Sequence, residues 1–407
     1  MSKTYPFWET ESRGIIHSIY AEVRATDPIH RAIGPVSGNP IWFLTRYDDC
    51  VNFLKDNRFG KDVKRLPKEK SMRYGPGIDP NDPLTAVNAH LLNIDPPDHT
   101  RLRALVHKAF TPRMVENLRP RIQQIADELL NAMHGEVDLI ASYAFPLPIT
   151  VIAEMLGVPV SDQEKFKSWT KTLLFDTDLE RSQMAAMEFI NYMNNMMDER
   201  RASPQDDLLT ALLNAEEAGD KLNHEELLSM IFLLLVAGHE TTVNLIGNGM
   251  LALMQHPDQQ AQLVAALDDD EAVKTAIDEM LRYNGPVETT TFRVAMEEVR
   301  ISDMVIEQGD MVLAALLAAN RDPAVFDNPD TFDITRTPNR HIAFGTGIHY
   351  CLGAPLARLE GQIAIPALLR HFPQIELNAA YDDLEWNPSL LLHGLKSLPV
   401  RVVAAKQ

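Results

Sequence analysis

One of the two cysteines in the chain stands in a glycine-rich stretch that suits a chemically active thiol. Residues 344–353 read FGTGIHYCLG, which places Cys351 among three glycines. Glycine allows the backbone to take positive φ or to approach a ligand closely. The pattern of residues 354–371 predicts an amphipathic helix with Pro355 in its first turn. Cys351 should therefore precede a helix N-terminus, where backbone N–H groups and the helix dipole stabilise a thiolate.

A second group of polar residues interrupts the longest helical pattern in the chain. This pattern begins after Asn223, where Glu226 completes a capping box, and it stops at Pro257. Its centre is almost wholly apolar until residues 237–242, which read AGHETT. Small residues there leave room for a group to lie against the helix, and a threonine hydroxyl can release a backbone carbonyl and open the helix locally. The charge of Glu240 is costly to bury alone, so it should be paired or connected to water.

Composition and charge narrow the class of protein. The 407 residues are 45% hydrophobic and 23% charged, with a formal net charge of −19. Such an acidic chain is a poor partner for nucleic acids and for anionic membrane surfaces. The longest strongly apolar run, residues 230–238, is too short to span a bilayer, and the N-terminal segment has no signal-peptide core. Two cysteines give no disulfide framework. We expect a soluble cytoplasmic protein that binds neither nucleic acid nor membrane.

The remaining pattern predicts the scaffold that holds these residues. Helical periodicity dominates, whereas strand-like runs are short and lie at residues 41–45, 299–306, 311–319 and 398–403. Because helices and strands are segregated, the predicted fold class is mainly α, of the α+β type, with small β-sheets. No repeat or linker divides the sequence, so residues 1–407 are predicted to form a single domain. Residues 61–93 and 173–180 are candidate functional or mobile loops.

Taken together, these motifs resemble those of the cytochrome P-450 family. The stretch around Cys351 carries the full FGxGxHxCxG pattern of the family's haem-binding loop, and AGHET at 237–241 resembles the oxygen-activation motif of its long central helix. Glu279 and Arg282 match the family's ExxR motif. Further matches, in the family's order, are HTRLR at 99–103, TFRVA at 291–295, DPAVFDNPDTFDITR at 322–336 and LKSLPV at 395–400. The resemblance covers essentially the whole chain, is closest to the soluble bacterial members, and implies a helix-rich domain with its long central helix over a haem.

The resemblance implies a role for each matching residue around the cofactor. The Cys351 thiolate would bind the iron of haem b, iron protoporphyrin IX. A cationic clamp on the haem propionates would consist of His99, Arg103, Arg293 and His349. Other haem-binding positions would be Ala237, Gly238, Phe344, Gly345 and Gly353.

Catalytic, structural and substrate-binding roles follow from the same resemblance. Thr241 would steer protons to oxygen, and Glu240 would feed that relay from solvent. Glu279 and Arg282 would form an ion pair that braces the haem loop, with either Arg336 or His341 as its third member. The substrate pocket would include Leu234, Val287, Thr290, Leu391 and Leu392.

The implied activity is that of a haem-thiolate monooxygenase. It would insert one oxygen atom of O2 into a C–H bond by hydroxylation, or into a C=C bond by epoxidation. Its substrate would be an apolar or amphipathic small molecule such as a terpenoid, steroid, fatty acyl chain or macrolide. Since no flavin or dinucleotide-binding fingerprint is fused to the chain, electrons would come from NAD(P)H through a ferredoxin or flavodoxin and its reductase. The expected enzyme is bacterial, monomeric and part of secondary metabolism.

Two other functions remain open from the sequence. A peroxygenase driven by H2O2 is disfavoured by Thr241 and Glu240, because such enzymes usually lack this alcohol–acid pair. A haem sensor or carrier without turnover would need only Cys351 and the cationic clamp. The second cysteine, Cys50, matches no motif and is predicted to lie in the core.

Overall fold

The computed structural model of the chain describes residues 3–35, 38–74, 82–176, 178–217 and 219–403. Helices of all kinds hold 57% of the described residues and the sheets are small, which confirms the predicted mainly-α fold. The chain divides into two compact units, each made of separate segments. Unit 1 comprises Met1–Arg73, Arg119–Leu147 and Thr241–Gln407, and unit 2 comprises Tyr74–Leu118 and Pro148–Glu240. The single domain over residues 1–407 stays a prediction.

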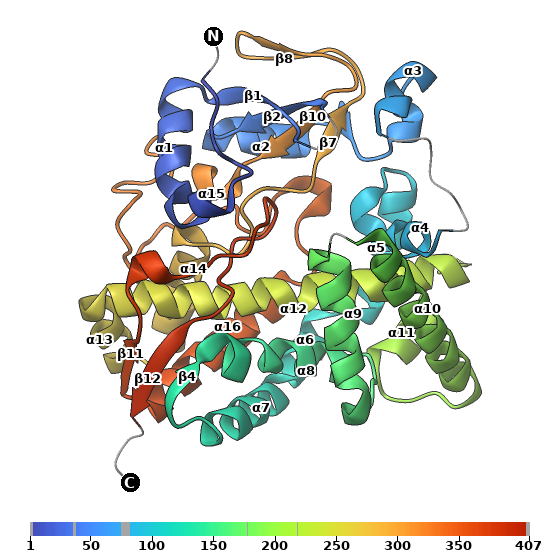
Figure 1. Cartoon of the computed structure of the whole chain (residues 1–407). Coiled ribbons are helices and arrows are strands. Elements are labelled where there is room, and N and C mark those ends of the chain that lie inside the picture. Colours follow the sequence, from blue (N-terminus) through green and yellow to red (C-terminus); the bar gives the residue numbers. More distant parts are fainter. Residues whose placement is uncertain (1–2, 36–37, 75–81, 177, 218, 404–407) are drawn as a thin grey trace. The chain divides into compact units, whose positions relative to one another are not determined.

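Unit 1 contains a five-stranded sheet with the order β1-β2-β10-β7-β3. Its strands are β1 (Ile29–Ile33), β2 (Pro40–Leu44), β3 (Phe59–Gly60), β7 (Arg293–Ala295) and β10 (Met311–Ala314). Beside it lie α1 (Ile16–Thr26), α2 (Tyr47–Lys55) and α15 (Leu316–Ala319) (Figure 1). Because side chains alternate along a strand, Phe43 packs into one apolar cluster with Tyr20 of α1, and Leu44 into another with Phe53 of α2. Cys50 is fully buried in the second cluster, as predicted.

Unit 1 also contains a group of helices around the helix that follows the cysteine loop. This helix, α16 (Ala354–His371), packs against α7 (Arg119–Asn131) and α14 (Asp270–Tyr283), and α13 (Pro257–Ala265) lies next to both α14 and α16. A second sheet has the order β11-β12-β4, with strands β4 (Gly135–Asp138), β11 (Gln374–Leu377) and β12 (Pro399–Val403). Strands β8 (Val299–Ile301) and β9 (Met304–Ile306) form a separate hairpin.

Two of the strand-like runs do not form single strands. In residues 311–319, β10 ends at Ala314 and the following residues form α15. This run is apolar throughout, and periodicity cannot distinguish a buried strand from a buried helix over so short a length. Residues 299–306 fold into the β8–β9 hairpin, whose turn contains Ser302 at a positive φ of 51°.

Unit 2 is a group of helices. They are α4 (Pro83–Asn88), α5 (Asp98–Ala109), α6 (Pro112–Asn117), α9 (Gln163–Phe175), α10 (Leu179–Ala202) and α11 (Leu208–Asn214), with a hairpin of β5 (Glu216–Glu217) and β6 (Asp220–Lys221). Helix α10 packs against α4, α9 and α11. Aromatic rings of α9 and α10, among them Phe166 and Phe189, form its core. Helix α8 (Pro146–Met155) has residues in both units.

The two predicted loops are only partly within the described residues. Residues 75–81 of the first loop and residue 177 of the second lie outside them. The described part of residues 61–93 carries short helices, α3 (Lys68–Ser71) and α4. The same part also holds the short 3₁₀ segments η2 (Val63–Arg65), η3 (Met72–Tyr74) and η4 (Leu91–Asn93). Elsewhere lie the 3₁₀ segments η1 (Thr10–Ile15), η6 (Val160–Asp162), η7 (Gly347–His349) and η8 (Tyr381–Asp383) and the π-helix η5 (Ile140–Ala144).

The longest helix is α12 (His224–Gln255), which has the length predicted from the sequence. The backbone N–H of Asn223 donates to Glu226 Oε2 and the N–H of Glu226 donates to Asn223 Oδ1, both at 2.9 Å, so the capping box is confirmed. In the described part of the chain this is the one helix long and apolar enough to cross a membrane, but 67% of its most apolar window is buried inside the protein. That burial is typical of a core helix. Its residues up to Glu240 belong to unit 2, and those from Thr241 belong to unit 1.

Candidate active site

The cysteine loop of unit 1 has a backbone shape that requires glycine. Gly345 and Gly347 have positive φ angles of 67° and 76°. A Cβ at Gly347 would lie 2.5 Å from the carbonyl oxygen of Leu54, so the end of α2 approaches the loop too closely for any side chain. The N–H of Cys351 donates to the carbonyl of Phe344 at 3.0 Å and closes the loop.

Cys351 is placed where a thiolate ligand would be favoured. It is half-buried and lies outside any disulfide among the described residues. Helix α16 begins three residues later at Ala354, with Pro355 in the first turn as predicted. N–H groups at such a terminus lower a thiol pKa. A soft, partly accessible thiolate is the ligand that haem iron takes in cysteine-ligated haem proteins, so this donor fits a haem.

The aromatic wall of the loop is held by a group that no sequence motif indicated. The Arg358 guanidinium lies 4.5 Å from the Phe344 ring centroid, and its Nε is 2.9 Å from Asp278 Oδ1. His341 Nε2 lies 3.4 Å from the same carboxylate oxygen. Burial acts to raise the pKa of Asp278, but His341 and Arg358 outweigh it, and the net pKa is lowered.

The ExxR residues form a fully buried ion pair on α14. Arg282 donates from Nε to Glu279 Oε2 at 2.7 Å and from Nη2 to Oε1 at 2.8 Å, a bidentate contact. The third member is Arg336, whose Nε lies 3.2 Å from Glu279. His341 pairs with Asp278 instead. The choice between Arg336 and His341 was open in the sequence because both lie in the segment before the loop.

A short chain of hydrogen bonds leads from this ion pair to the cysteine loop. Arg282 Nη1 donates to the carbonyl of Asn320 at 3.0 Å. The Asn320 side chain in turn accepts a 2.7 Å hydrogen bond from the N–H of Ile342, just before the loop. The Glu279–Arg282 pair therefore stabilises the segment from which the loop emerges.

The remaining predicted haem-binding residues of unit 1 lie on β7, at the end of η7 and directly before α16. Arg293 is buried on β7, with its guanidinium 5.4 Å from the Phe53 ring centroid. His349 is half-buried at the end of η7, two residues before Cys351. Gly353 immediately precedes α16, and a Cβ there would lie 3.9 Å from the Cys351 sulfur.

Unit 2 holds the other predicted cofactor residues on α5 and α12. His99 is buried near the start of α5, and Arg103 follows one turn later on the same face. On α12, Gly238 is half-buried and Ala237 is exposed, and Leu234, a predicted substrate-pocket residue, is half-buried one turn before Gly238. The place of each residue along α5 or α12 decides which face of its helix it occupies.

Glu240 is buried and has a neighbour, as its charge requires. Its Oε1 lies 3.4 Å from Nε2 of His239, while Nδ1 of that histidine lies 2.8 Å from the carbonyl of Leu235. A neutral histidine carries only one ring N–H. His239 could therefore donate to both oxygens, one from each ring nitrogen, only in its protonated form.

Thr242, which follows Thr241 on α12, contacts a carboxyl group that the sequence analysis did not identify. Thr241 is half-buried. Thr242 Oγ1 donates to Glu360 Oε2 on α16 at 3.0 Å, and Glu360 Oε1 has no hydrogen-bond partner among the described residues. Burial raises the pKa of Glu360 to about 8, and the Thr242 bond only partly opposes this. In the sequence Glu360 is one of several polar residues of the amphipathic helix 354–371, so its burial was not evident from the pattern.

Replacing Glu360 with glutamine should change how stability depends on pH. The pKa of Glu360 is about 8 in the folded chain, against an ordinary value of 4.5. Between these pH values the folded state binds more protons than the unfolded state. The free energy of unfolding therefore falls as pH rises, by up to about 1.4 kcal/mol per pH unit. Glu360→Gln should remove this loss, as chemical denaturation of both proteins at about pH 5 and about pH 9 would measure.

The quantity to compare is the difference in unfolding free energy between the wild type and Glu360→Gln. Glu288 also has a raised pKa, of about 7, and its titration lowers stability in the same direction as pH rises. Glu288 is present in both proteins, so its contribution cancels. A stability difference that is equal at both pH values would contradict the raised pKa of Glu360.

Three of the predicted pocket residues lie on two paired segments of unit 1. Val287 and Leu392 face each other in an antiparallel bridge, and the N–H of Glu288 donates to the carbonyl of Leu391 at 2.9 Å. Thr290 is bound to β10, since its hydroxyl accepts a 3.1 Å hydrogen bond from the N–H of Ala314. Leu234 belongs to unit 2.

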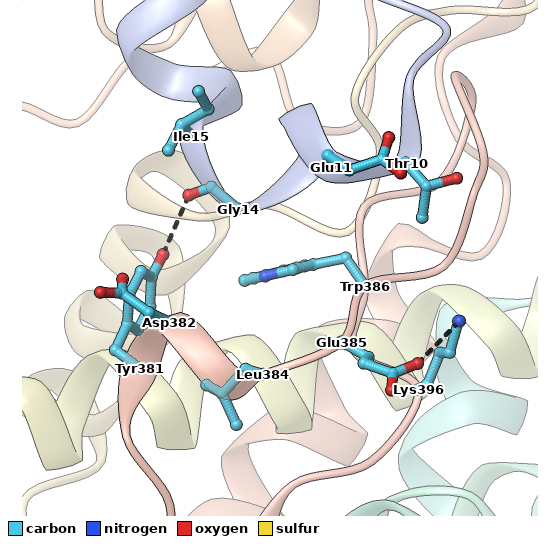
Figure 2. A pocket seen from close by; sticks show the side chains of 10 residues that line it. All are labelled: Thr10, Glu11, Gly14, Ile15, Tyr381, Asp382, Leu384, Glu385, Trp386 and Lys396. Carbon is cyan, nitrogen blue, oxygen red and sulfur yellow. Dashed lines mark hydrogen bonds and ion pairs between the residues drawn. The ribbon is translucent and has the colours of Figure 1, made fainter.

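A groove on unit 1 contains none of the predicted site residues. Figure 2 shows Trp386 projecting into it between η1 and the segment around η8, with Tyr381 donating to the carbonyl of Gly14 at 3.2 Å. The groove has a volume of about 420 Å³, and Lys396 pairs with Glu385 at its rim at 2.9 Å. No residue of the cysteine loop lines this groove.

Comparison with known proteins agrees with the resemblance seen in the motifs. The model of the family described as Cytochrome P450 matches residues 148–393, more than half of the chain. The chain belongs to the cytochrome P450 family. It is 50% identical over 392 residues to cytochrome P450 107B1 of Saccharopolyspora erythraea, covering 95% of this chain and 94% of that protein.

Solved structures of other P450s match nearly the whole chain. The chain is similar to the polyketide biosynthesis cytochrome P450 PksS of Bacillus subtilis, which is 46% identical over 94% of this chain and 95% of that protein. The structure of PksS matches with a TM-score of 0.91, covering 98% of this chain and all of that one. The myxobacterial CYP267B1, solved in complex with myristic acid, also gives 0.91, at 47% identity and over 99% and 100% of the two chains. Membership makes the chain a monooxygenase, an oxidoreductase that uses haem iron and O2 with small-molecule substrates and redox partners.

Proposed function

We propose that this P450 hydroxylates or epoxidises an apolar or amphipathic product of bacterial secondary metabolism, with Cys351 as the ligand of haem b. The observation that carries the proposal is the half-buried thiol in a glycine loop immediately before α16, braced through Asn320 by the Glu279–Arg282 pair. When bound, the haem supplies the oxygen chemistry that protein side chains lack. The chain supplies the thiolate, the orientation of the substrate and the protons.

Several residues would hold the cofactor in place. Their roles rest on the family motifs and on charge, because arginine and histidine donors suit the carboxylates of the haem propionates. The proposed propionate partners are His99, Arg103, Arg293 and His349. The proposed contacts with the ring are Ala237, Gly238, Phe344, Gly345 and Gly353.

Thr241 and Glu240 would deliver protons to the reacting oxygen. Glu240 is buried beside His239, and Thr241 follows it on α12, half-buried. A hydroxyl can accept one proton and donate another, so Thr241 would pass protons that Glu240 receives from solvent.

Removing the Thr241 hydroxyl should uncouple the consumption of reductant from product formation. In Thr241→Val, product formed per NAD(P)H oxidised should fall by about tenfold or more, because proton delivery by a positioned group contributes that much or more to rate. Thr241→Ser keeps the hydroxyl and should stay coupled. The measurement compares product, NAD(P)H oxidised and H2O2 released for both variants. Full coupling in the valine variant would exclude this role.

Leu234, Val287, Thr290, Leu391 and Leu392 are the proposed substrate-binding residues. Apolar side chains with a few hydroxyls are typical of small-molecule pockets. The name of PksS places that relative in polyketide biosynthesis, which makes polyketides the first class to test here. We further propose a cytoplasmic monomer that receives electrons from NAD(P)H through a ferredoxin or flavodoxin and its reductase.

A substrate screen tests the proposal as a whole. The purified haem protein would be titrated with macrolides, steroids, terpenoids and fatty acids, with the spin-state shift of the haem as the readout. Hits would then be incubated with NAD(P)H, a ferredoxin and its reductase. Reductant-dependent oxygenation of a hit is the expected result. Oxygenation with H2O2 alone would indicate a peroxygenase, and binding without any turnover would indicate a sensor or carrier.

A further inference from the structure

Arg13 is a buried arginine that belongs to none of the sequence motifs. It lies in η1 and is 2% exposed. Nη1 donates to Glu288 Oε2 at 2.7 Å and to the carbonyl of Ser389 at 3.1 Å, and Nη2 donates to the carbonyl of Phe7. Burying the charge of an arginine is costly unless its N–H groups are paired. The hydrogen bonds of Arg13 therefore indicate a structural role for the groups that it binds.

The carboxylate that Arg13 binds lies in the middle of a proposed pocket segment. Glu288 is fully buried, and Tyr20 of α1 donates to its Oε1 at 2.9 Å. Burial raises the pKa of Glu288 to about 7, while Arg13 and Tyr20 act to lower it. Because side chains alternate along an extended segment, anchoring Glu288 on one side directs the neighbouring Val287 to the other.

The carbonyl that Arg13 binds lies in the second proposed pocket segment. Ser389 does more than accept this hydrogen bond: its hydroxyl oxygen accepts the N–H of Leu391 at 3.2 Å and the N–H of Leu392 at 3.0 Å. Ser389 therefore fixes the backbone of both leucines. Arg13 Nη1 thus donates both to Glu288 in the first segment and to Ser389 in the second. The two segments face each other at the Val287–Leu392 bridge.

We propose that Arg13 is a positioning residue for the substrate pocket, which sets the separation and orientation of residues 286–290 and 389–392 from behind. The inference rests on the pocket of the proposed function, since Val287, Leu391 and Leu392 are its members. Arginine suits the task because its planar fork holds several acceptors in a fixed geometry, whereas a lysine ammonium carries a single, rotatable point charge. Arg13 itself acts through Glu288 and Ser389.

Loss of Arg13 should loosen both segments together. Glu288 would keep only Tyr20 and would be left as a buried carboxyl without a counter-charge, which favours its protonation or its movement toward water. The Ser389 carbonyl would lose its buried donor at the same time. Because pocket side chains act through sub-ångström placement, such loosening should weaken ligand binding.

The experiment uses the haem-loaded full chain with Arg13→Lys, Arg13→Met and Glu288→Gln. The matched control is Arg24→Met, because Arg24 of α1 is also buried but donates to the carbonyl of Ala318, at 2.8 Å. Hydrogen exchange is followed in peptides that cover residues 286–292 and 388–394. The Arg13 variants should exchange at least about tenfold faster in both peptides, because local opening becomes less costly, while the control should not.

A ligand pair reports on the pocket itself. Imidazole and 4-phenylimidazole both coordinate haem iron, but only the second places a phenyl group in the pocket. The Kd of 4-phenylimidazole should rise by about tenfold in the Arg13 and Glu288 variants, with the Kd of imidazole unchanged. Arg13→Lys keeps the charge and guards against a methionine variant that does not fold.

Three results would overturn the inference. The first is that hydrogen exchange in the two peptides is unchanged in the Arg13 variants. The second is that Arg24→Met changes exchange as much as the Arg13 variants do. The third is that exchange becomes faster while the Kd of 4-phenylimidazole stays the same. A failure of the proposed function is separate, because it would show as the absence of a thiolate-type haem spectrum in the wild type. The exchange measurement on the wild type and variants is independent of that spectrum.

Discussion

Cys351→Ser is expected to lower turnover by at least about a hundredfold, because it removes the proposed ligand of the iron. Changes to groups that merely orient a metal ligand already cost about 10–100-fold, and loss of the ligand itself should cost more. A serine hydroxyl is far less acidic than a thiol and is a poor donor of electron density to iron. Turnover of a hit from the substrate screen, with NAD(P)H and the redox proteins, is the measurement.

The matched control for this variant is the other cysteine. Cys50 is fully buried in α2 and donates from Sγ to the carbonyl of Leu44 at 3.2 Å. Burial raises the pKa of the Cys50 thiol well above its ordinary value, so it stays protonated. Cys50→Ala should leave turnover per haem unchanged. If Cys351→Ser kept wild-type turnover per haem, Cys351 would not be the ligand.

Arg282→Met should destabilise the fold by about 3–5 kcal/mol, the usual cost of breaking a buried ion pair by removing one partner. Glu279 would keep Arg336 but lose its bidentate contact. The carbonyls of Asn320, Pro329 and Thr331 would each lose a hydrogen bond from Arg282. Since Asn320 also holds Ile342 before the cysteine loop, haem retention should fall together with stability. Denaturant unfolding and the haem content of the purified protein measure the two effects.

An exposed ion pair of the same helix provides the control. Lys274 and Glu271 form an i,i+3 pair on α14, and both side chains are largely exposed. Exposed pairs contribute little, so Lys274→Met should cause no measurable loss of stability or haem. Equal stability of Arg282→Met and Lys274→Met would contradict the bracing role.

The sequence predicted those features whose signal is local. The capping box at Asn223 and Glu226, and the start of α16 after Gly353, depend on residues close together in the chain. Capping residues and glycines act through their own backbone geometry, so their effect is readable without a partner. The mainly-α fold followed from helical periodicity for the same reason.

Features that depend on distant partners were not predictable in this way. The Thr242–Glu360 bond joins residues 118 positions apart, and the Arg13–Glu288 bond joins residues 275 apart. None of these four residues carries a sequence signal that identifies its partner. The helix in residues 316–319 was missed because a uniformly apolar run has no period to distinguish helix from strand.

The central claim is that the Cys351 thiolate binds the haem iron, and the carbon monoxide difference spectrum of the reduced, purified wild type tests it most directly. The electron-rich sulfur should move the Soret band of the ferrous–CO complex to the long wavelength of thiolate-ligated haem. In Cys351→Ser this band should be absent, while Cys50→Ala should retain it. A wild-type protein without haem, or with a Soret band at the shorter wavelength of histidine-ligated haem, would contradict the account.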